Sequence, residues 1–522
     1  MTTEVGNGGT AEADWQRLNP RMLAVTPLRQ LFGFLPVIAV VLVVGGSDLD
    51  GRFYALVAGV LAVIVAGVLR WVTTRYRITS ERVELRSGLV FRSARSVPRD
   101  RIRSVDLTAG PVHRVFGLSV VKVGTGEHVG NTESRELTLD AVSAAEADQL
   151  RQRLLDRLDG TDQDDADLPD SATAPAAGAG TTLAVLDWSW LRFAPLTVSS
   201  LAAVAGVVGA FTQFVGEIGI GPSRIAELSG VSTEFDTAPL WLGLSIFASV
   251  LLVIAVIGAL LIFTEAWWGF ALVREPGGTL RIRRGLLTTR SVSLEERRLR
   301  GVEVGEPLLM RLGSGARLTA VATGLGGASG AGRSALLPPA PLDQARRVAG
   351  LVLADDHFPA DAPLRQHPAA ALRRRLVRAV LPVLLGAAVL FLIPALGFAP
   401  LPGWAGWAVL GLLPITVLLA RDAYRNLGHA LTERYLVTRH GAGMRRTVTL
   451  KRSGVIGWTV SQSLFQRRVG LVTLTATTAA GSGAYHVLDV GMADGLAVAE
   501  QAVPGLLGPF LHRDESALGS PT

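Results

Sequence analysis

The sequence predicts an α-helical membrane protein in which six transmembrane helices, arranged as three hairpins, alternate with three small β domains. Three observations lead to this fold class. The 522 residues have a mean hydropathy of +0.37 and only 18% are charged, which is typical of a membrane protein with soluble parts. Several long uncharged runs approach the ~20 residues that a helix needs to cross a bilayer. Arginine-rich segments with alternating apolar residues, such as residues 101–126, indicate β structure between those runs.

Two pairs of apolar runs predict the first two hairpins. The first pair covers residues 31–46 and 53–69 and is joined by the polar turn SDLDGR. The second pair covers residues 193–215 and 238–263. Trp71, Tyr76, Trp267 and Trp268 follow these pairs, at the position where aromatic side chains are expected to lie at the membrane interface. No cleavable signal peptide precedes the first run, so we expect that run to remain in the mature protein.

The third hairpin lies within one uncharged stretch, residues 379–420, which is too long for a single span. Pro400, Pro402 and Gly403 interrupt it, and their backbone preferences favour a turn where the chain must reverse. The cores of all six predicted spans lack ionisable side chains and carry only neutral polar ones, namely Thr212, Gln213, Ser245, Ser249 and Thr416. This composition argues against an ion-coupled transporter.

Arginine placement predicts the orientation of the hairpins. Arginines concentrate outside the first and third hairpins, at positions 17, 21, 29, 70, 75, 77, 373, 374, 375, 378, 421 and 425. The turn of the first hairpin has a single arginine, Arg52, and the turn of the third has no charge. Because positively charged flanks stay in the cytoplasm, we expect both termini and all three β domains to be cytoplasmic.

The segments that follow the three hairpins resemble one another. Residues 97 onward align with residues 450 onward without a gap, and this alignment pairs Arg99 with Arg452 and Arg114 with Arg467. The segment after the second hairpin is looser but pairs Arg311 with Arg114. The third segment matches from residue 433, so we expect it to be about six residues shorter at its start. Each segment ends in an amphipathic stretch, which predicts a repeat of hairpin, short strands and closing helix.

The repeat resembles the bacterial pleckstrin-homology (PH) membrane proteins of the YdbS/YdbT type. The phrases that carry the resemblance are RYRITSERVELRSGLV, SVPRDRIRSVDL and HRVFGLSVVKV, with QRLNPRMLAVTP before the first span. The resemblance implies that each β domain is a PH-like β barrel or sandwich closed by a C-terminal helix. It also implies a multi-pass protein of the bacterial inner membrane, and it supplies no catalytic residues.

The predicted organisation has ten segments. They are an N-terminal tail and interfacial segment (1–30), hairpin 1 (31–70), PH-like domain 1 (71–158), an acidic Ala/Gly linker (159–190), hairpin 2 (191–264), a divergent PH-like domain 2 (265–355), a basic linker (356–378), hairpin 3 (379–420), PH-like domain 3 (421–512) and a C-terminal tail (513–522).

The cysteine and histidine content of the chain predicts neither an enzyme nor a bound cofactor. Cysteine is absent, which excludes thiolate catalysis and Cys-ligated metals. The eight histidines lack metal-ligand spacing, and we expect them to lie on the surface or in loops. Aromatic residues make up only 6% and are not interleaved with the basic ones, so the sequence predicts no nucleic-acid partner.

Arginines in the first and third β domains are the remaining candidates for a binding site. They are Arg99, Arg101, Arg103, Arg114, Arg452, Arg467 and Arg468, which we expect to contact anionic lipids or protein partners near the inner leaflet. Strand alternation predicts that Arg99, Arg101 and Arg103 share one face opposite Ile102. The alternative is a solvated strand edge whose charge only sets the topology.

These patterns predict a non-enzymatic membrane protein whose cytoplasmic β domains serve as assembly or partner-binding modules. The expected partners are membrane lipids and other membrane proteins or further copies of the chain, and the resemblance suggests a role in envelope stress tolerance. The alternative function is transport or lipid handling by the six-helix bundle.

Overall fold

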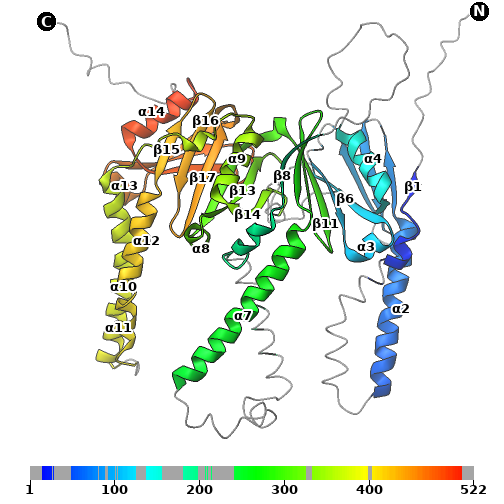
Figure 1. Ribbon diagram of the computed structural model, residues 1–522, viewed down its shortest axis with the longest axis horizontal. Coiled ribbons are helices and arrows are strands. Elements are labelled where there is room, and N and C mark those ends of the chain that lie inside the picture. The colour runs from blue at the N-terminus through cyan, green and yellow to red at the C-terminus, as the bar shows by residue number, and fades with distance from the viewer. Residues whose placement is uncertain are drawn as a thin grey trace, which may run out of the picture. The chain divides into compact units, whose positions relative to one another are not determined.

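The computed structural model of the chain (Figure 1) describes ten ranges, with a few single positions between them. These ranges are 15–25, 49–79, 81–88, 92–99, 104–124, 137–155, 180–197, 240–324, 332–397 and 402–507. The chain divides into two compact units, Met1–Glu296 and Arg297–Thr522, and the division falls inside the predicted second β domain.

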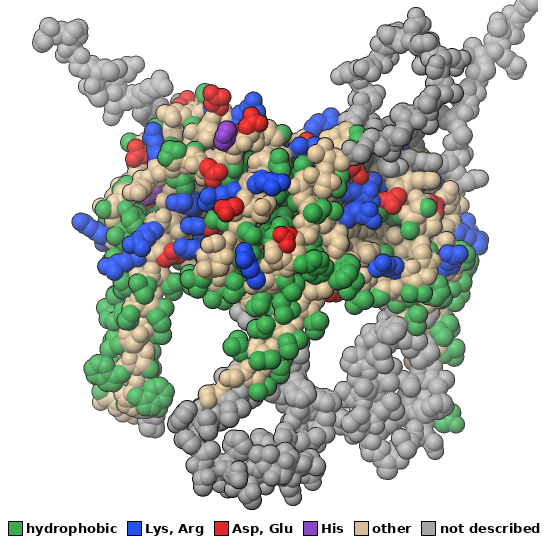
Figure 2. Space-filling model, viewed as in Figure 1, with side chains coloured by type: hydrophobic (Ala, Val, Ile, Leu, Met, Phe, Trp, Pro, Cys, Tyr) green, Lys and Arg blue, Asp and Glu red, His purple; other side chains and the backbone are tan. Residues whose placement is uncertain are grey.

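Within the described ranges, three helices are long and apolar enough to cross a membrane: Ser249–Trp267, Ala369–Ala395 and Ala405–Arg425. The first of them is part of α7 (Leu240–Trp267), the second is α10, and the third combines α11 (Ala405–Leu410) with α12 (Leu413–Arg425). Helix α2 (Leu49–Thr73) covers the predicted run 53–69. Hydrophobic side chains cover α7 and the pair formed by α10 and α12 (Figure 2).

The third hairpin reverses where the sequence predicts. Helix α10 ends at Ala395 and α11 begins at Ala405, on either side of Pro400 and Pro402. Run 31–46 and most of run 193–215 lie outside the described residues. The start of run 193–215 was predicted wrongly, because Phe193 closes the 3₁₀ helix η3 (Trp188–Phe193) and is buried in protein.

The same order of elements follows each of the helices α2, α7 and α12. In the first copy it is β2 (Arg75–Ile78), β3 (Arg82–Ser87), β4 (Ser93–Pro98), β5 (Ser104–Ala109), α3 (Pro111–Val115), β6 (Leu118–Gly124), β7 (Leu137–Ser143) and α4 (Ala144–Leu155). In the second copy it is β9 (Ala271–Glu275), β10 (Thr279–Arg284), β11 (Thr289–Glu295), β12 (Leu299–Pro307), α8 (Leu308–Leu312), β13 (Gly315–Ala322), β14 (Ala335–Pro341) and α9 (Leu342–Leu353).

In the third copy the order is β15 (Gly428–Leu431), β16 (Tyr435–His440), β17 (Met444–Lys451), β18 (Gly457–Ser461), α13 (Leu464–Arg467), β19 (Leu471–Thr477), β20 (Ala484–Gly491) and α14 (Met492–Ala502). The third copy is therefore not shortened, and the prediction of a six-residue loss was wrong. Its first strand, GHAL, precedes the phrase ERYLVTRH with which the sequence alignment began.

Backbone conformation repeats at equivalent positions of the copies. The turn between the second and third strands has a positive φ at Gly88 (102°), Gly285 (109°) and Gly441 (123°). Only glycine adopts this region without strain, which explains its presence in all three turns. A residue in the turn between the short helix and the next strand also has a positive φ in each copy, at Gly117, Ser314 and Gly470.

Strand pairing joins consecutive copies within each compact unit. In the first unit a seven-stranded sheet has the order β7-β6-β5-β11-β10-β9-β8, where β8 (Thr181–Val185) lies in the predicted linker. In the second unit a six-stranded sheet has the order β14-β13-β12-β17-β16-β15. The fourth strand of one copy thus pairs with the third strand of the next, an arrangement that the prediction of separate β domains did not include.

The first and third copies each bury a hydrophobic core. The first core includes Val83 and Val97 from one sheet and Val105 and Leu139 from the other, closed by Leu150 of α4. Tyr76 belongs to the same core, is only 4% exposed and donates its hydroxyl to Glu146 at 3.0 Å. The prediction of Tyr76 as a membrane-interface residue was therefore wrong, because it lies on β2 and points inward.

Candidate functional site

A short helix follows the fourth strand of each copy, and all three helices expose apolar side chains. Val115 of α3, Leu312 of α8, and Leu464 and Phe465 of α13 are each at least 71% exposed. Such large apolar side chains are rarely left facing water in groups. These helices are therefore candidates for contact with lipid or with another protein.

An arginine connects α8 to the helix that enters the third copy. Arg311 donates two hydrogen bonds of 2.9 Å, one to each carboxylate oxygen of Asp422 on α12. Asn426 donates a further hydrogen bond of 2.9 Å to Asp422. The planar guanidinium matches the carboxylate in this two-pronged geometry, which fixes the orientation of both groups.

Arg114 occupies the same position on α3 and also connects to the next copy. Its Nη1 donates to the carbonyl oxygen of Leu286 at 2.8 Å, and the Leu286 amide donates to the carbonyl oxygen of Glu265 in α7 at 2.9 Å. Arg114 was predicted as a lipid or partner contact, and the structure gives it an internal hydrogen bond across the junction between copies.

A buried carboxylate of β20 connects helix α13 to the first turns of α10. Asp489, 2% exposed, accepts a hydrogen bond of 2.9 Å from Nε2 of Gln466 and forms ion pairs with Arg374 and Arg375 of α10. Ser463 and Gln466 form a capping box that fixes the helix start. The network orients α13 so that Arg467 and Arg468 are exposed. Neither guanidinium group has a hydrogen bond or ion pair within the described ranges.

The other predicted arginines have different surroundings. Arg452 is tied inside the third copy, where Nε donates to the Ala502 carbonyl at 2.7 Å and Nη1 to the Glu433 carbonyl at 2.8 Å, so it joins the end of α14 to the β15–β16 turn. Arg99 lies between β4 and β5, outside any strand, and the predicted strand alternation at this position was wrong. Arg101 and Arg103 lie outside the described residues.

The second copy has a basic surface that the sequence motifs did not predict. Arg283, Arg284 and Arg290 line a cavity of about 360 Å³ beside the end of α7, and Arg283 and Arg290 are exposed. Arg284 stacks over Trp267 at 4.3 Å, and burial, together with the charge of Arg290, lowers its pKa to about 10. The sequence signal for this surface is the basic segment RIRRGLLTTR, residues 281–290, in the β domain that follows the second predicted hairpin.

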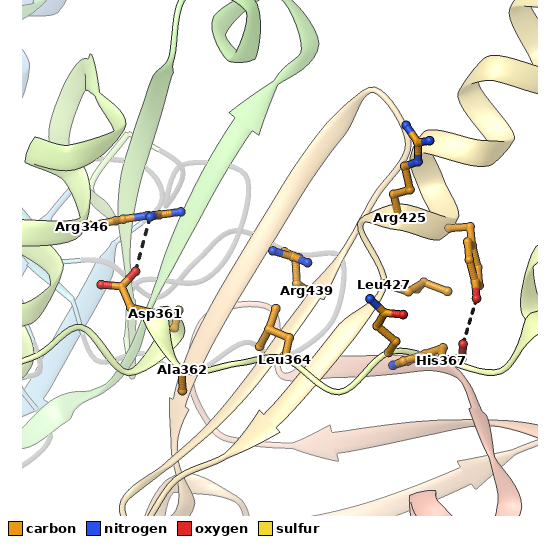
Figure 3. A pocket seen from close by; sticks show the side chains of 11 residues that line it. Arg346, Asp361, Ala362, Leu364, His367, Arg425, Leu427 and Arg439 are labelled. Atoms are coloured by element: carbon orange, nitrogen blue, oxygen red, sulfur yellow. Dashed lines mark hydrogen bonds and ion pairs between the residues drawn. The ribbon is translucent and has the colours of Figure 1, made fainter.

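A second cavity, of about 570 Å³, lies in the second unit (Figure 3). Arg346 of α9, Arg425 at the end of α12 and Arg439 of β16 line it, and the carboxylate lining it is Asp361, 3.5 Å from Arg346. The Nε of Arg439 is buried and has no hydrogen-bond partner among the described residues. Burial and the neighbouring arginines, with Arg445 foremost, lower the pKa of Arg439. The excess of positive charge makes this cavity a candidate anion site.

Three histidines among the described residues are buried, contrary to the predicted surface positions. His113, His367 and His429 are each 6% exposed or less. Nε2 of His367 lies 3.0 Å from Nδ1 of His429, although 62 residues separate them in sequence. Burial and the neighbouring His367 and Arg365 lower the pKa of His429 to about 4. No group of three or more potential metal ligands occurs within the described part of the chain.

The helices and the arginine-lined β domains define a membrane protein with PH-like β domains. Residues 27–158 and 380–502 match the bacterial PH domain family. UPF0699 transmembrane protein YdbT of Bacillus subtilis (strain 168) is 23% identical over 456 residues, covering 85% of this chain and 88% of that protein. UPF0699 transmembrane protein YdbS of the same bacterium is 26% identical over 109 residues, covering 21% of this chain and 64% of that protein.

The chain is similar to the bacterial PH domain membrane proteins of the YdbS/YdbT type, as the sequence motifs predicted. No solved structure matches it. The second copy lies outside both regions that match the family, yet it has the same order of strands and helices as the other two.

Proposed function

We propose that this chain is a non-enzymatic protein of the bacterial inner membrane whose cytoplasmic PH-like domains act as assembly modules and support envelope stress tolerance. The observation that carries the proposal is strand pairing between consecutive copies, β5 with β11 and β12 with β17. Strand addition at a sheet edge is a common way for proteins to bind one another, because the backbone supplies the hydrogen bonds.

The charges at the junctions favour the same interpretation. In the second unit, Arg445 of β17 donates its Nε to Glu306 of β12 at 2.8 Å. In the first unit, Arg151 of α4 donates to Glu275 of β9 at 2.8 Å and to Ser293 of β11 at 3.3 Å. Each junction thus combines backbone pairing with ion pairs, as protein interfaces do.

Crosslinking in intact membranes, followed by mass spectrometry, tests the assembly role. We expect crosslinks from the β domains to copies of the chain or to other membrane proteins. A chain that is always solitary contradicts the proposal. Reporter fusions near Arg99 and Arg300 test the topology, and we expect both on the cytoplasmic side, so opposite sides would contradict it.

We further propose that α13 contacts the anionic inner leaflet. Leu464 and Phe465 are 78% and 71% exposed, and Arg467 and Arg468 are exposed beside them. An arginine near an anionic surface contributes on the order of 1 kcal/mol, and the apolar side chains add their burial. The attachment of α13 to α10 through Asp489 holds it close to the start of a membrane-spanning helix.

The absence of cysteine in the chain allows a direct test of this contact. A polarity-sensitive dye on Phe465→Cys should be quenched by spin-labelled lipid in anionic vesicles. The matched control is Glu433→Cys, on the turn at the far end of β15 from α12. Equal quenching at both positions would exclude the lipid contact. Cysteine labelling along the spans tests the alternative of transport, and labelling confined to loops counts against that alternative.

A second candidate function is the binding of a small phosphate- or carboxylate-bearing solute in the 570 Å³ cavity. The unpartnered Nε of Arg439 favours it. Calorimetric titration of the purified protein with inorganic phosphate should detect binding that Arg346→Gln and Arg439→Gln abolish. Arg347→Gln is the matched control, because Arg347 is the next residue on α9 and does not line the cavity. Unchanged binding in all three variants would remove this candidate.

A further inference from the structure

The two junctions between copies have the same register. In the first, Val105 of β5 lies opposite Ser293 of β11, and in the second, Val302 of β12 lies opposite Thr449 of β17. Val105 and Val302 occupy the same position in their copies, as do Ser293 and Thr449, by the alignment that matches residue 97 with 294 and 450. A single pairing geometry therefore operates twice in one chain.

In the described part of the chain, one third strand and one fourth strand have no partner strand from a neighbouring copy. β4 is the third strand of the first copy, and the described residues contain no copy before it. β18 is the fourth strand of the third copy, and the described residues contain no copy after it. Each forms the edge of its sheet, since β4 pairs with β3 and β18 pairs with β19.

Both edges are accessible. The first four residues of β4 are exposed, as are the last three residues of β18. Beside β18, Ile456 is 63% exposed, and within it Val460 is 39% exposed. Exposed apolar edge strands are a site of unwanted pairing unless a partner covers them, so natural proteins rarely leave them bare.

We propose that β18 of one chain pairs antiparallel with β4 of a second copy of the same chain, in the register of the two internal junctions. That register places Trp458 opposite Ser96 and Val460 opposite Ala94 of the second copy. The inference rests on the proposed assembly function and names its partner. Because the two edges differ, the contact is head to tail and builds a ring or a filament.

Pro98 at the end of β4 does not obstruct this pairing. A proline cannot donate a hydrogen bond to a neighbouring strand. The equivalent residues, Glu295 of β11 and Lys451 of β17, lie just outside the paired stretch at both internal junctions. Pro98 would likewise lie beyond the stretch from Ser93 to Val97 that faces β18.

Disulfide crosslinking between two differently tagged full-length chains tests the proposal. One chain carries Ala94→Cys and the other Val460→Cys, and both are co-expressed in membranes and treated with a mild oxidant. Directly opposed residues of antiparallel strands lie within disulfide range. The matched control replaces Val460→Cys by Thr459→Cys, which is shifted by one residue and so directs its side chain to the other face of the sheet.

We expect a covalent dimer containing both tags, at least about tenfold more abundant with Val460→Cys than with the Thr459→Cys control. The pair Ser93→Cys and Ser461→Cys, also opposed in this register and exposed, should give the same product. Absence of the mixed dimer for both pairs overturns the proposal. A crosslink that forms only within a chain carrying Ala94→Cys and Val460→Cys together also overturns it, because it indicates closure of the chain on itself.

Failure of this inference can be told apart from failure of the proposed function. If the cysteine pairs do not react but membrane crosslinking captures a different protein, the assembly function stands and the second copy is excluded as its partner. If neither experiment yields a crosslink, both proposals fail.

Discussion

Arg311 and Arg467 occupy the same position in the second and third copies but have different surroundings. Arg311 makes a two-pronged ion pair with Asp422, on the helix that enters the next copy. Arg467 is exposed, and the described residues after it contain no further copy. The repeat thus places an arginine at the same position of both copies. A neighbouring copy determines whether that arginine forms an internal ion pair or stays available for a partner.

The largest expected effect concerns Asp489, which fixes α13 in the last copy. Asp489→Ala leaves Arg374 and Arg375 beside each other without a counter-charge, and breaking a buried ion pair in this way costs about 3–5 kcal/mol. Urea unfolding in detergent micelles would measure the loss. Glu433→Gln, at an exposed turn, is the control and should change stability by less than about 0.5 kcal/mol. A similar loss in both variants would show that the network does not hold α13.

Acid should weaken the third copy through its buried histidines. The folded pKa of His429 is about 4, against 6.5 for the free side chain, so below pH 6.5 the unfolded chain binds a proton that the folded chain excludes. Stability is therefore complete above pH 6.5 and falls until about pH 4, by up to roughly 3 kcal/mol for this group.

The pH dependence of unfolding in His429→Asn would check this expectation. We predict a shallower loss of stability between pH 6.5 and 4 than in the unsubstituted protein. The exposed His357 provides the control, since His357→Asn should leave the slope unchanged. Equal slopes in all three proteins would contradict the buried, neutral state of His429.

The smallest expected effect on stability distinguishes Arg311 from Arg467. Arg311→Gln removes charge-assisted hydrogen bonds and should cost about 1–2 kcal/mol, whereas Arg467→Gln at the equivalent position should cost less than about 0.5 kcal/mol. Unfolding of the two variants under the same conditions measures the difference. Equal costs would mean that the contact with Asp422 does not stabilise the junction.

Much of the architecture follows from local sequence patterns. Pro400, Pro402 and Gly403 predicted the reversal of the third hairpin because proline and glycine restrict the backbone locally. The order of strands and the closing helices followed from apolar alternation and amphipathic stretches. The glycines at 88 and 285 aligned because a positive φ at the turn requires them.

Contacts that depend on distant segments were not predictable in this way. The pairing of β5 with β11 joins residues about 180 positions apart, and nothing in either strand identifies its partner. His367 and His429 lack any sequence motif because their approach depends on how β15 packs against the start of α10. Nothing in the local sequence distinguishes Arg452 from Arg468. Arg452 makes its hydrogen bonds inside the third copy because the end of α14 lies beside it.

A disulfide across the first junction would show whether consecutive copies pair through their strands. Thr108 and Arg290 lie opposite each other on β5 and β11, and neither is buried. The chain carrying Thr108→Cys and Arg290→Cys should form an intramolecular disulfide under mild oxidation, while Thr108→Cys with Ser291→Cys, shifted by one residue, should not. Equal reaction in the two variants, or none in either, would contradict the junction and the assembly built on it.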